Sequence, residues 1–485
     1  MQLFKGTPLF KIRDWFRGLK DKVAKTLQLT KEQLKSLKER LKVSFYTYSI
    51  ILNVSGDLYQ GDVVLTVEQA QEIIGGIEDQ VSGGNRTKRQ AFKDRRYPKT
   101  LWSEGVSYYF HSLAKMRNAF IKGAKLWEKD TCINFAENRF AENRIMVFPE
   151  DGCWSYVGKL GGEQKLSLGS GCETPDIAAH EIGHALGFFH TMSRYDRDDF
   201  ITVNTVNVKV CLYQFNKETP STNDNYGMTY DYGSIMHYGG TSASYNRKPT
   251  MVPKDVKYQQ TLGSPIISFI ELSMLNEHYK CKEKCDPIRS VKCEMGGFPH
   301  PRDCQKCICP GGYGGKRCTE RPSGCGETIR ATSKWTTLED VVGNNRENDE
   351  FFTCNYWLEV CYFQKPLKNR SRRFSVDGCK YAGVEIKTNK DQTLTGYRYG
   401  CSQLTLQSFT NRVPIMTYNR LYQSKTVLEY RYGKYFVTFL IQNDLFEPNN
   451  LVPGGSVVPA PLPPTTTTKS PAVGPQGSKC MDEST

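Results

Sequence analysis

Three of the seven histidines in this 485-residue chain lie within eleven positions, in the stretch AAHEIGHALGFFHTMSRYDRD. The pattern predicts a helix over residues 175–186, so His180 and His184, four residues apart, lie on one face of it. Gly187 follows as a left-handed helix stop, where the chain can turn and bring His190 back toward the other two. The sequence therefore predicts three imidazoles around one point.

Three neutral imidazoles around an open coordination position suit a catalytic zinc ion. Such an ion keeps a water molecule and lowers the pKa of that water toward about 7. Glu181 is the expected general base, which takes the proton of the water and later passes it to a leaving amine. A bare HExxH pattern also occurs in ordinary helices, but the longer pattern that includes Gly187 and His190 is far more specific.

The longer stretch resembles the astacin branch of the metzincin metalloproteases. The family pattern continues past the third histidine to an R-x-D-R-D, and SIMHY at residues 234–238 matches the family's Met-turn. The resemblance implies that Met236 supports the floor of the zinc site. It also implies that Tyr238 ligates zinc at rest and swings to the oxyanion of the scissile carbonyl. The R-x-D-R-D stands here as Arg194, Asp196, Arg197 and Asp198.

The resemblance covers residues 96–281 and implies an α+β metzincin protease domain with an upper mixed sheet and a zinc-site helix. Disulfides Cys132–Cys281 and Cys153–Cys172 follow from it. Helical spacing also predicts helices over residues 113–127 and 268–281. The implied function is that of a secreted zinc-dependent endopeptidase, made as a zymogen, that hydrolyses peptide bonds in extracellular proteins.

Two positions depart from the family pattern. The family usually has Glu directly after the third histidine, where it holds the buried amino terminus of the mature enzyme, and here that residue is Thr191. The family's G-Q-R near the end of the domain, whose Arg favours acidic residues after the scissile bond, is replaced by Gly-Ser-Pro at residues 263–265. We therefore expect a mature form without the terminal salt bridge and assume no preference for acidic substrates.

The segment before the protease resembles an astacin propeptide. LYQGD is similar to the family's F-x-G-D, in which the Asp, here Asp62, ligates the zinc in place of the catalytic water. Residues 86–89 read Arg-Thr-Lys-Arg, which is a cleavage site for a processing protease of the furin type and leaves Gln90 as the new terminus.

The downstream regions resemble two extracellular modules. A cysteine-dense stretch containing CICPGGYGGKRC resembles an EGF-like module, which is too small to build a core and must be stapled by disulfides. From Cys325 onward, short β-rich runs resemble an all-β CUB sandwich. The expected divisions are a propeptide with an inhibitory Asp at 1–89, the protease at 90–282, the EGF-like module at 283–319, the CUB-like domain at 325–445 and a Pro/Thr-rich disordered tail at 446–485.

Cysteine usage points to an oxidising compartment. Seventeen cysteines, closely spaced between residues 281 and 325, favour disulfides over free thiols, although six cysteines alone allow fifteen pairings. The module resemblances imply five pairs, Cys285–Cys304, Cys293–Cys307, Cys309–Cys318, Cys325–Cys354 and Cys379–Cys401. Together with the two pairs of the protease domain, these leave Cys211, Cys361 and Cys480 without an assigned partner, so at least one thiol is free or pairs between chains.

Other features bear on location and partners. The first residues lack the apolar core of a signal peptide, but the cysteines are the stronger indication and favour secretion. No uncharged apolar run reaches the ~20 residues of a membrane span, and nothing resembles a nucleic-acid module. The excess of basic residues before residue 99 would attract acidic surfaces. A solvated helix face together with a processing site explains it more simply. Sequons at Asn53, Asn85 and Asn369 predict a glycoprotein if they are used.

Two rival functions remain at this stage. One is a catalytically silent extracellular binding protein that acts through its EGF and CUB modules, and the other is a permanently latent zymogen. Glu181 and the three histidines are all present, which favours the enzyme, and the basic cleavage site argues against permanent latency. The expected partners of the enzyme are protein substrates in the extracellular matrix or among secreted proteins.

Overall fold

The structure is a computed structural model that describes residues 58–66, 68–69, 71–73, 91–93, 95–111, 116–208, 215–218, 223–359, 377–400, 405–408, 410–432 and 437–446. The predicted features outside these residues are the helical start of the propeptide, the basic site at 86–89, Gln90, the three sequons, the Pro/Thr-rich tail and Cys211, Cys361, Cys401 and Cys480.

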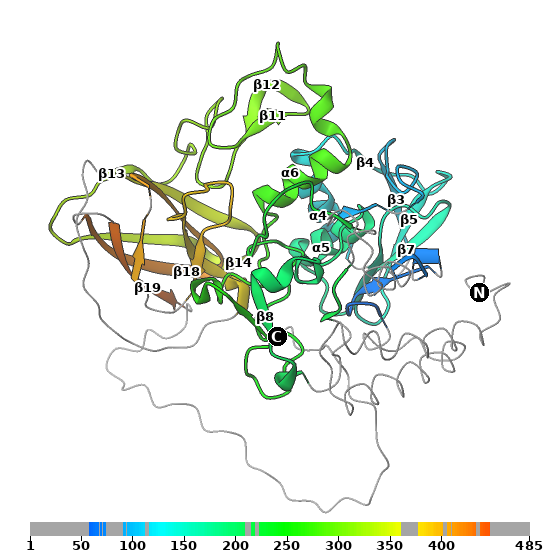
Figure 1. The fold of residues 1–485 in the computed structure, drawn as a ribbon, viewed down its shortest axis with the longest axis horizontal. Helices are drawn as coiled ribbons and strands as arrows, with labels where there is room; N and C mark the ends of the chain where they lie inside the picture. The colour runs from blue at the N-terminus through cyan, green and yellow to red at the C-terminus, as the bar shows by residue number, and fades with distance from the viewer. Residues whose placement is uncertain are drawn as a thin grey trace, which may run out of the picture.

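A six-stranded mixed sheet forms one half of the protease region (Figure 1). Strands β6 and β7 pair antiparallel, whereas every other neighbouring pair is parallel. The mixed sheet predicted from the family resemblance is therefore present, and its edge strand β1 comes from the segment upstream of the protease. In sheet order the strands are β1 Val63–Val64, β6 Cys153–Tyr156, β7 Glu163–Leu168, β5 Arg144–Phe148, β3 Val106–Phe110 and β4 Phe135–Glu137.

Two helices pack closely behind this sheet and fix the position of the histidines. A Cβ on Gly123 of the first helix would lie 2.8 Å from the backbone nitrogen of Ala179 on the second, so only glycine permits this approach. The buried indoles of Trp127 and Trp102 donate hydrogen bonds to the carbonyls of Ala179 and Ala185, at 2.8 and 2.9 Å. None of the helices in the described ranges is long and apolar enough to cross a bilayer. The α-helices among the described residues are α4 Arg117–Lys129, α5 Pro175–Ala185 and α6 Phe269–His278.

The other half of the protease region consists of α6, short strands and single 3-10 turns. Ser268 and Glu271 form a capping box at the start of α6. Strand β2, Ala91–Phe92, pairs with β9, Asn223–Asp224, so the chain just after the basic site is already seated on the domain. The remaining elements of this half are β8 Ile201–Val203, which pairs with β10 Met251–Pro253, and the 3-10 helices η2 Thr191–Ser193, η3 Arg197–Asp199, η4 Thr205–Asn207, η6 Val256–Tyr258 and η7 Cys281–Lys284. Another 3-10 helix, η8 Asp377–Cys379, lies in the C-terminal region.

Six of the seven implied disulfides are present, and the seventh involves Cys401, which lies outside the described residues. Cys132–Cys281 closes a sequence separation of 149 residues around the protease region. Three bonds staple residues 285–318, whose two short strands are β11 Phe298–His300 and β12 Asp303–Ile308. The cysteine pairing of this small module was thus predicted correctly.

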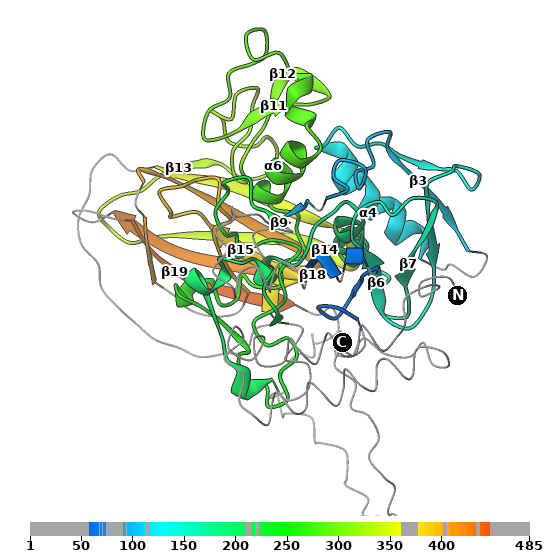
Figure 2. The same ribbon diagram turned by 45° about the vertical axis from the view of Figure 1, so that its right-hand side comes forward.

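The C-terminal region is a seven-stranded sheet that lies on the opposite side of the helices from the protease sheet (Figures 1 and 2). Its buried face packs apolar side chains such as Leu358, Val384 and Val413. The all-β character predicted for this region is confirmed, whereas its identity as a CUB sandwich stays a prediction. The strands are β13 Thr328–Arg330, β14 Thr336–Glu359, β15 Ala382–Ile386, β16 Tyr397–Tyr399, β17 Thr405–Gln407, β18 Arg412–Tyr432 and β19 Val437–Phe446.

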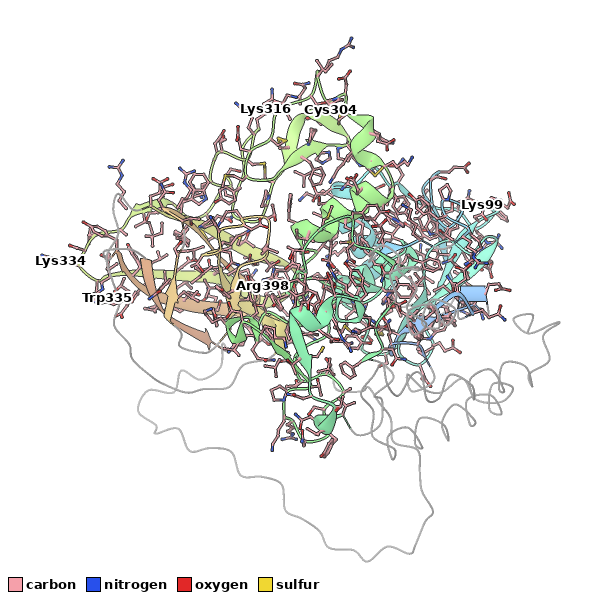
Figure 3. All side chains as sticks on the ribbon, viewed as in Figure 1. Lys99, Cys304, Lys316, Lys334, Trp335 and Arg398 are labelled. Carbon is pink, nitrogen blue, oxygen red and sulfur yellow. A yellow bond between two sulfur atoms is a disulfide. The ribbon has the colours of Figure 1, made fainter. Side chains whose placement is uncertain are left out.

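Buried polar contacts join this sheet to the protease region. Arg398, labelled in Figure 3, donates to Glu385 Oε2 of its own sheet at 2.8 Å and to the hydroxyl of Ser264 in the protease region. Thr395 donates to the buried carboxylate of Asp231 at 3.0 Å. Because these side chains are buried, the two regions form one packed unit, and Lys334 and Trp335 mark the far end of the sheet (Figure 3).

Candidate active site

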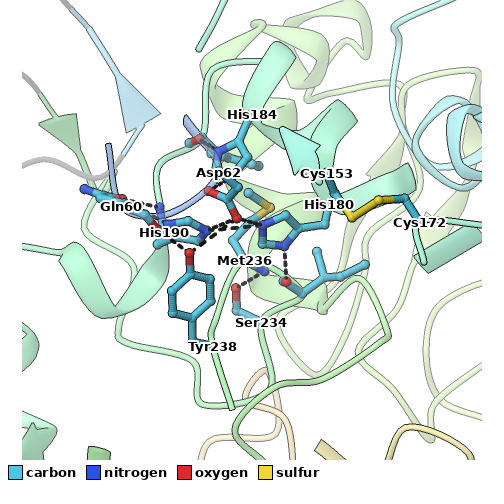
Figure 4. Close-up of polar contacts among 12 residues, drawn as sticks. Gln60, Asp62, Cys153, Cys172, His180, His184, His190, Ser234, Met236 and Tyr238 are labelled. Carbon is cyan, nitrogen blue, oxygen red and sulfur yellow. Dashed lines mark hydrogen bonds and ion pairs between the residues drawn. A yellow bond between two sulfur atoms is a disulfide. The ribbon is translucent and has the colours of Figure 1, made fainter. Parts of the chain in front are cut away.

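Helix α5 and the turn that follows it bring the three histidines together (Figure 4). His180 and His184 lie one turn apart, and the helix ends before Gly187, whose φ of 110° only glycine adopts readily. The chain then reverses, and the Nε2 atoms of His180 and His190 come within 3.2 Å of each other. The predicted helix and its glycine stop are both present.

Hydrogen bonds on the far side of each ring fix the direction of its lone pair. The Nδ1 atoms of His180 and His184 lie 2.8 and 2.7 Å from the carbonyl oxygens of Ile235 and Phe188. A carbonyl only accepts, so each Nδ1 carries the proton and each neutral Nε2 is left with a lone pair. Because these lone pairs converge, the arrangement calls for a cation at its centre.

Asp62 supplies a fourth ligand atom from the upstream segment. Its Oδ2 lies 3.2 Å from His180 Nε2 and 3.1 Å from His190 Nε2, and its Oδ1 lies 3.4 Å from His184 Nε2. A tetrahedral ion with bonds of about 2.0–2.1 Å separates its ligands by about 3.3 Å, so these four groups match a zinc site. His184 Nε2 and Asp62 Oδ1 are also buried without a hydrogen-bond partner, so their lone pairs fit the role of metal ligands.

A tight turn presents Asp62 to the histidines. The backbones of Tyr59 and Val63 exchange hydrogen bonds of 2.9 and 3.0 Å, and Gln60 and Gly61 between them have φ values of 53° and 99°. Glycine at the second position makes this left-handed conformation inexpensive. The QGD sequence therefore forms a loop tip with Asp62 on its inner side.

Glu181 and Tyr238 flank the cluster. Glu181 is buried on α5, and burial together with the charge of Asp62 raises its pKa well above the ordinary value. Tyr238 packs its ring 4.4 Å from the ring of His190, donates a hydrogen bond to the carbonyl of Gln60, and has its hydroxyl 3.4 Å from Asp62 Oδ2. All six predicted site residues therefore meet in one place.

Comparisons with known proteins agree with this geometry. The family model described as Astacin, a peptidase family, matches residues 94–280. Zinc metalloproteinase nas-31 of Caenorhabditis elegans is 48% identical over 418 residues, which cover 82% of this chain and 68% of that protein. The chain belongs to the astacin family. As an astacin it is a zinc metalloendopeptidase.

Two further proteins are similar to this astacin. Zinc metalloproteinase nas-23 of the same nematode is 35% identical over 383 residues, which cover 74% of this chain and 69% of that protein. A solved structure, the high choriolytic enzyme 1, a hatching enzyme zinc-protease from Oryzias latipes, covers 40% of this chain and 99% of its own with 29% identity and a TM-score of 0.35.

The Met-turn of this astacin lies directly against the zinc helix. A Cβ on Gly183 would sit 2.7 Å from the sulfur of Met236, so glycine at position 183 lets the Met236 side chain approach the helix this closely. The backbone N–H of Thr191 donates to the carbonyl of Met236 at 2.9 Å. Met236 is thus placed at the floor of the cluster, as the family resemblance implies.

A carboxylate that sequence reasoning missed holds the Met-turn from behind. Glu271 of α6 accepts hydrogen bonds from the backbone N–H groups of Ile235 and Met236 at 3.0 and 3.1 Å, and from the hydroxyl of Ser234 at 2.5 Å. Burial raises its pKa, and these donors oppose that rise. The S-x-x-E spacing of the capping box was the available signal in the sequence, but it predicts only a helix start.

Thr191 takes part in the same network. Its hydroxyl lies 2.6 Å from the hydroxyl of Ser234, which in turn bonds Glu271. Thr191 stands where the family usually has Glu. Through Ser234, hydrogen bonds connect it to Glu271 of α6. In the uncut chain, this network supports the Met-turn from the side of α6.

The R-x-D-R-D stretch acts as scaffold. Arg194 bonds both oxygens of Asp196 at 2.8 Å and also donates to the carbonyls of Met228 and Thr229. Arg197 donates to the carbonyl of Met192 at 2.9 Å, although burial lowers its pKa. Arg194 thus ties the segment after the third histidine to the loop before the Met-turn, and Arg197 fixes the turns within that segment.

Proposed function

We propose that this astacin is secreted as a zymogen and that Asp62 keeps it latent by occupying the fourth ligand position. The observation that carries this proposal is the placement of Asp62 among His180, His184 and His190, from a segment that lies upstream of a furin-type site. A carboxylate in that position leaves no room for a reacting water. Cleavage after Arg89 would remove the carboxylate together with its segment.

In the processed enzyme the three histidines would hold zinc, which supplies an acidified water and polarises the scissile carbonyl. Glu181 takes a proton from the attacking water and delivers it to the leaving amine. Tyr238, released from the carbonyl of Gln60, donates a hydrogen bond to the oxyanion.

The flanking regions support an extracellular role. Six disulfides suit an oxidising compartment, and three of them staple residues 285–318 in the manner of an EGF-like module. We assign 1–89 as propeptide, 90–282 as protease, 283–319 as EGF-like, 325–445 as CUB-like and 446–485 as tail. Secreted or matrix proteins are the proposed substrates.

The catalytic part of the proposal is tested with Glu181→Gln in the processed enzyme. This variant should retain one zinc per chain but lose at least about 10²-fold in peptide hydrolysis, since no proton acceptor remains. Glu173→Gln, at an exposed position just before α5, is the matched control and should keep full activity. Undiminished turnover by the Glu181 variant would favour a different base.

The latency part is tested in the uncut precursor. Arg89→Ala blocks the basic site, and Asp62→Ala added to it should produce measurable hydrolysis. Glu68→Ala in the same background is the control, because this exposed side chain lies in the same segment but away from the histidines. If the Asp62 double variant stays as silent as Arg89→Ala alone, latency comes from blocking of the cleft by the segment as a whole.

A further inference from the structure

A second buried contact holds the upstream segment, and it lies beside the histidine cluster. Glu218, with 1% of its surface exposed, accepts hydrogen bonds on Oε1 from the hydroxyl of Tyr59 at 2.6 Å and from the side-chain amide of Gln60 at 2.8 Å. Its own backbone N–H donates to the carbonyl of Ser193 at 2.7 Å. Glu218 is therefore anchored to the segment that follows the third histidine.

The amide of Gln60 sits between an acceptor and a donor. Its oxygen lies 3.0 Å from His190 Nδ1, while its nitrogen lies 2.8 Å from Glu218. A carboxylate only accepts, so the NH₂ group must face Glu218, and the amide oxygen then accepts from the His190 N–H. We call the site formed by the Glu218 carboxylate and the His190 ring N–H the carboxamide pocket. The Gln60 side chain that lies in it is fully buried.

The pocket is complementary to a primary amide and to few other side chains of that length. A Glu side chain would oppose the carboxylate of Glu218, and a Lys side chain would present only donors to the N–H of His190. A Met or norleucine side chain would leave both groups without their hydrogen bonds, which is costly in a buried site. A primary amide of this length donates to Glu218 and accepts from His190 at the same time, as Gln60 does.

A substrate peptide must reach the same place. The upstream segment runs from this pocket across the histidines to the edge strand β6, where Val63 and Val64 pair with Ser155 and Tyr156. A peptide positioned for cleavage at the histidines takes over that path, and an exposed strand edge is a ready template for its backbone. One of its side chains close to the scissile bond therefore faces the carboxamide pocket.

We propose that the carboxamide pocket is a specificity subsite that selects substrates with a glutamine side chain near the scissile bond. This proposal rests on the proposed function, because it assumes that the processed protein cleaves peptides at the histidine cluster. Gln60 is then a substrate-like residue that the latent enzyme carries in its own upstream segment.

The test uses the processed full-length enzyme and a peptide scan. Gln, Glu, Lys or norleucine is placed in turn at each position from three before to three after the scissile bond, and kcat/KM is measured. One position should favour Gln over norleucine and over Glu by about tenfold to a hundredfold, as expected for paired hydrogen bonds to buried groups. Glu218→Gln should reduce the Gln-to-Glu ratio at that position at least tenfold, because the new amide can donate to a substrate carboxylate. Glu173→Gln should leave the ratio unchanged.

Binding of the same peptides to the Glu181→Gln protein separates this inference from the proposed function. If no peptide is cut but Gln peptides still bind better than their Glu and norleucine analogues, and lose that advantage in Glu218→Gln, the pocket stands and the proposed function fails. If peptides are cut without a Gln preference at any position, the proposal is overturned. A second experiment measures inhibition by a synthetic peptide of residues 57–66. If this peptide inhibits only when it carries Gln60, while substrates show no preference for Gln, the pocket serves latency alone and the proposal is overturned.

Discussion

Arg420 of the C-terminal sheet forms a two-pronged ion pair with Asp176 in the first turn of the zinc helix α5. Nη1 lies 2.6 Å from Oδ1 and Nη2 lies 3.3 Å from Oδ2, and both side chains are buried. Asp176 also faces the positive end of the helix dipole, where a carboxylate is favoured. The sheet is thus attached directly to the element that carries His180 and His184.

Arg420→Met should destabilise the protein strongly, because it leaves a buried carboxylate without its partner. Removing one member of a buried pair costs about 3–5 kcal/mol. Thermal unfolding should show a clear fall in Tm, and Asp176→Asn combined with Arg420→Met should recover part of it. Arg431→Met on the same strand, whose guanidinium stacks on the exposed ring of Trp335, should change Tm little. Equal shifts in Tm for the two Arg variants would mean that the buried ion pair contributes no more to stability than an exposed Arg–Trp contact.

Tyr238→Phe should lower kcat of the processed enzyme by roughly 10²-fold, the scale of losing one oxyanion donor, with little change in KM or Tm. The hydroxyl already reaches the segment that lies against the histidines, since it donates to the carbonyl of Gln60. Tyr245→Phe is the control, because that side chain is exposed. An unchanged kcat would leave Tyr238 with a packing role against His190 only.

Gly183→Ala should destabilise the site, although alanine is the better helix former by about 1 kcal/mol. The added Cβ would stand 2.7 Å from the sulfur of Met236, so the buried Met236 side chain must move away from α5. We expect a lower Tm and faster loss of zinc to a chelator. Met236→Ala in the same chain removes the clash and should restore part of both. A Tm above that of the unchanged protein would show that the turn yields freely.

The stability of the protein should fall on the acid side partly because of His278. Burial lowers the pKa of this imidazole to about 3, and Lys93 adds to the effect. Tyr226 lies 2.7 Å from its Nδ1, and the rings of Tyr97 and Tyr279 pack against it at 5.3 and 5.6 Å. Between pH 6.5 and 3 the unfolded chain binds a proton here that the folded chain does not, so the free energy of unfolding decreases as the pH falls.

His278→Phe keeps an aromatic ring at this position but cannot take up a proton. Its free energy of unfolding should therefore decline less steeply from pH 6.5 downward, by up to about 1.4 kcal/mol per pH unit for one proton. Urea unfolding at pH 7, 6, 5 and 4 measures both slopes. Parallel slopes for the two proteins would assign the acid sensitivity to other groups.

The parts of the site that the sequence predicted are those fixed by local spacing. The i, i+4 histidines and the glycine stop depend on neighbours in the chain, and both are present as predicted. The disulfides and the role of Met236 came from the family resemblance. Spacing alone cannot tell which of the cysteines pair.

Groups whose roles depend on distant partners were not predictable. Glu271 meets the Met-turn 35 to 37 residues earlier in the chain, Glu218 meets Gln60 across 158 residues, and Arg420 meets Asp176 across 244. In the sequence each is one charged residue among many, typical of a solvated surface. Only the folded chain shows that all three are buried and what each one contacts.

The Cys132–Cys281 bond closes a ring of chain that contains some residues of the site and leaves Asp62 outside it. His180, His184, His190 and Tyr238 all lie inside the closed ring of chain, whereas Asp62 lies in a stretch that precedes the first cysteine. One cut anywhere within the ring leaves both pieces joined, so a second cut is needed before any catalytic group can be lost. One cut at residues 86–89 severs every covalent link between Asp62 and the histidines, because no cysteine precedes Cys132. A single break in the chain therefore has opposite consequences at the two places: it detaches Asp62 from the site, but it leaves the histidines and Tyr238 covalently joined.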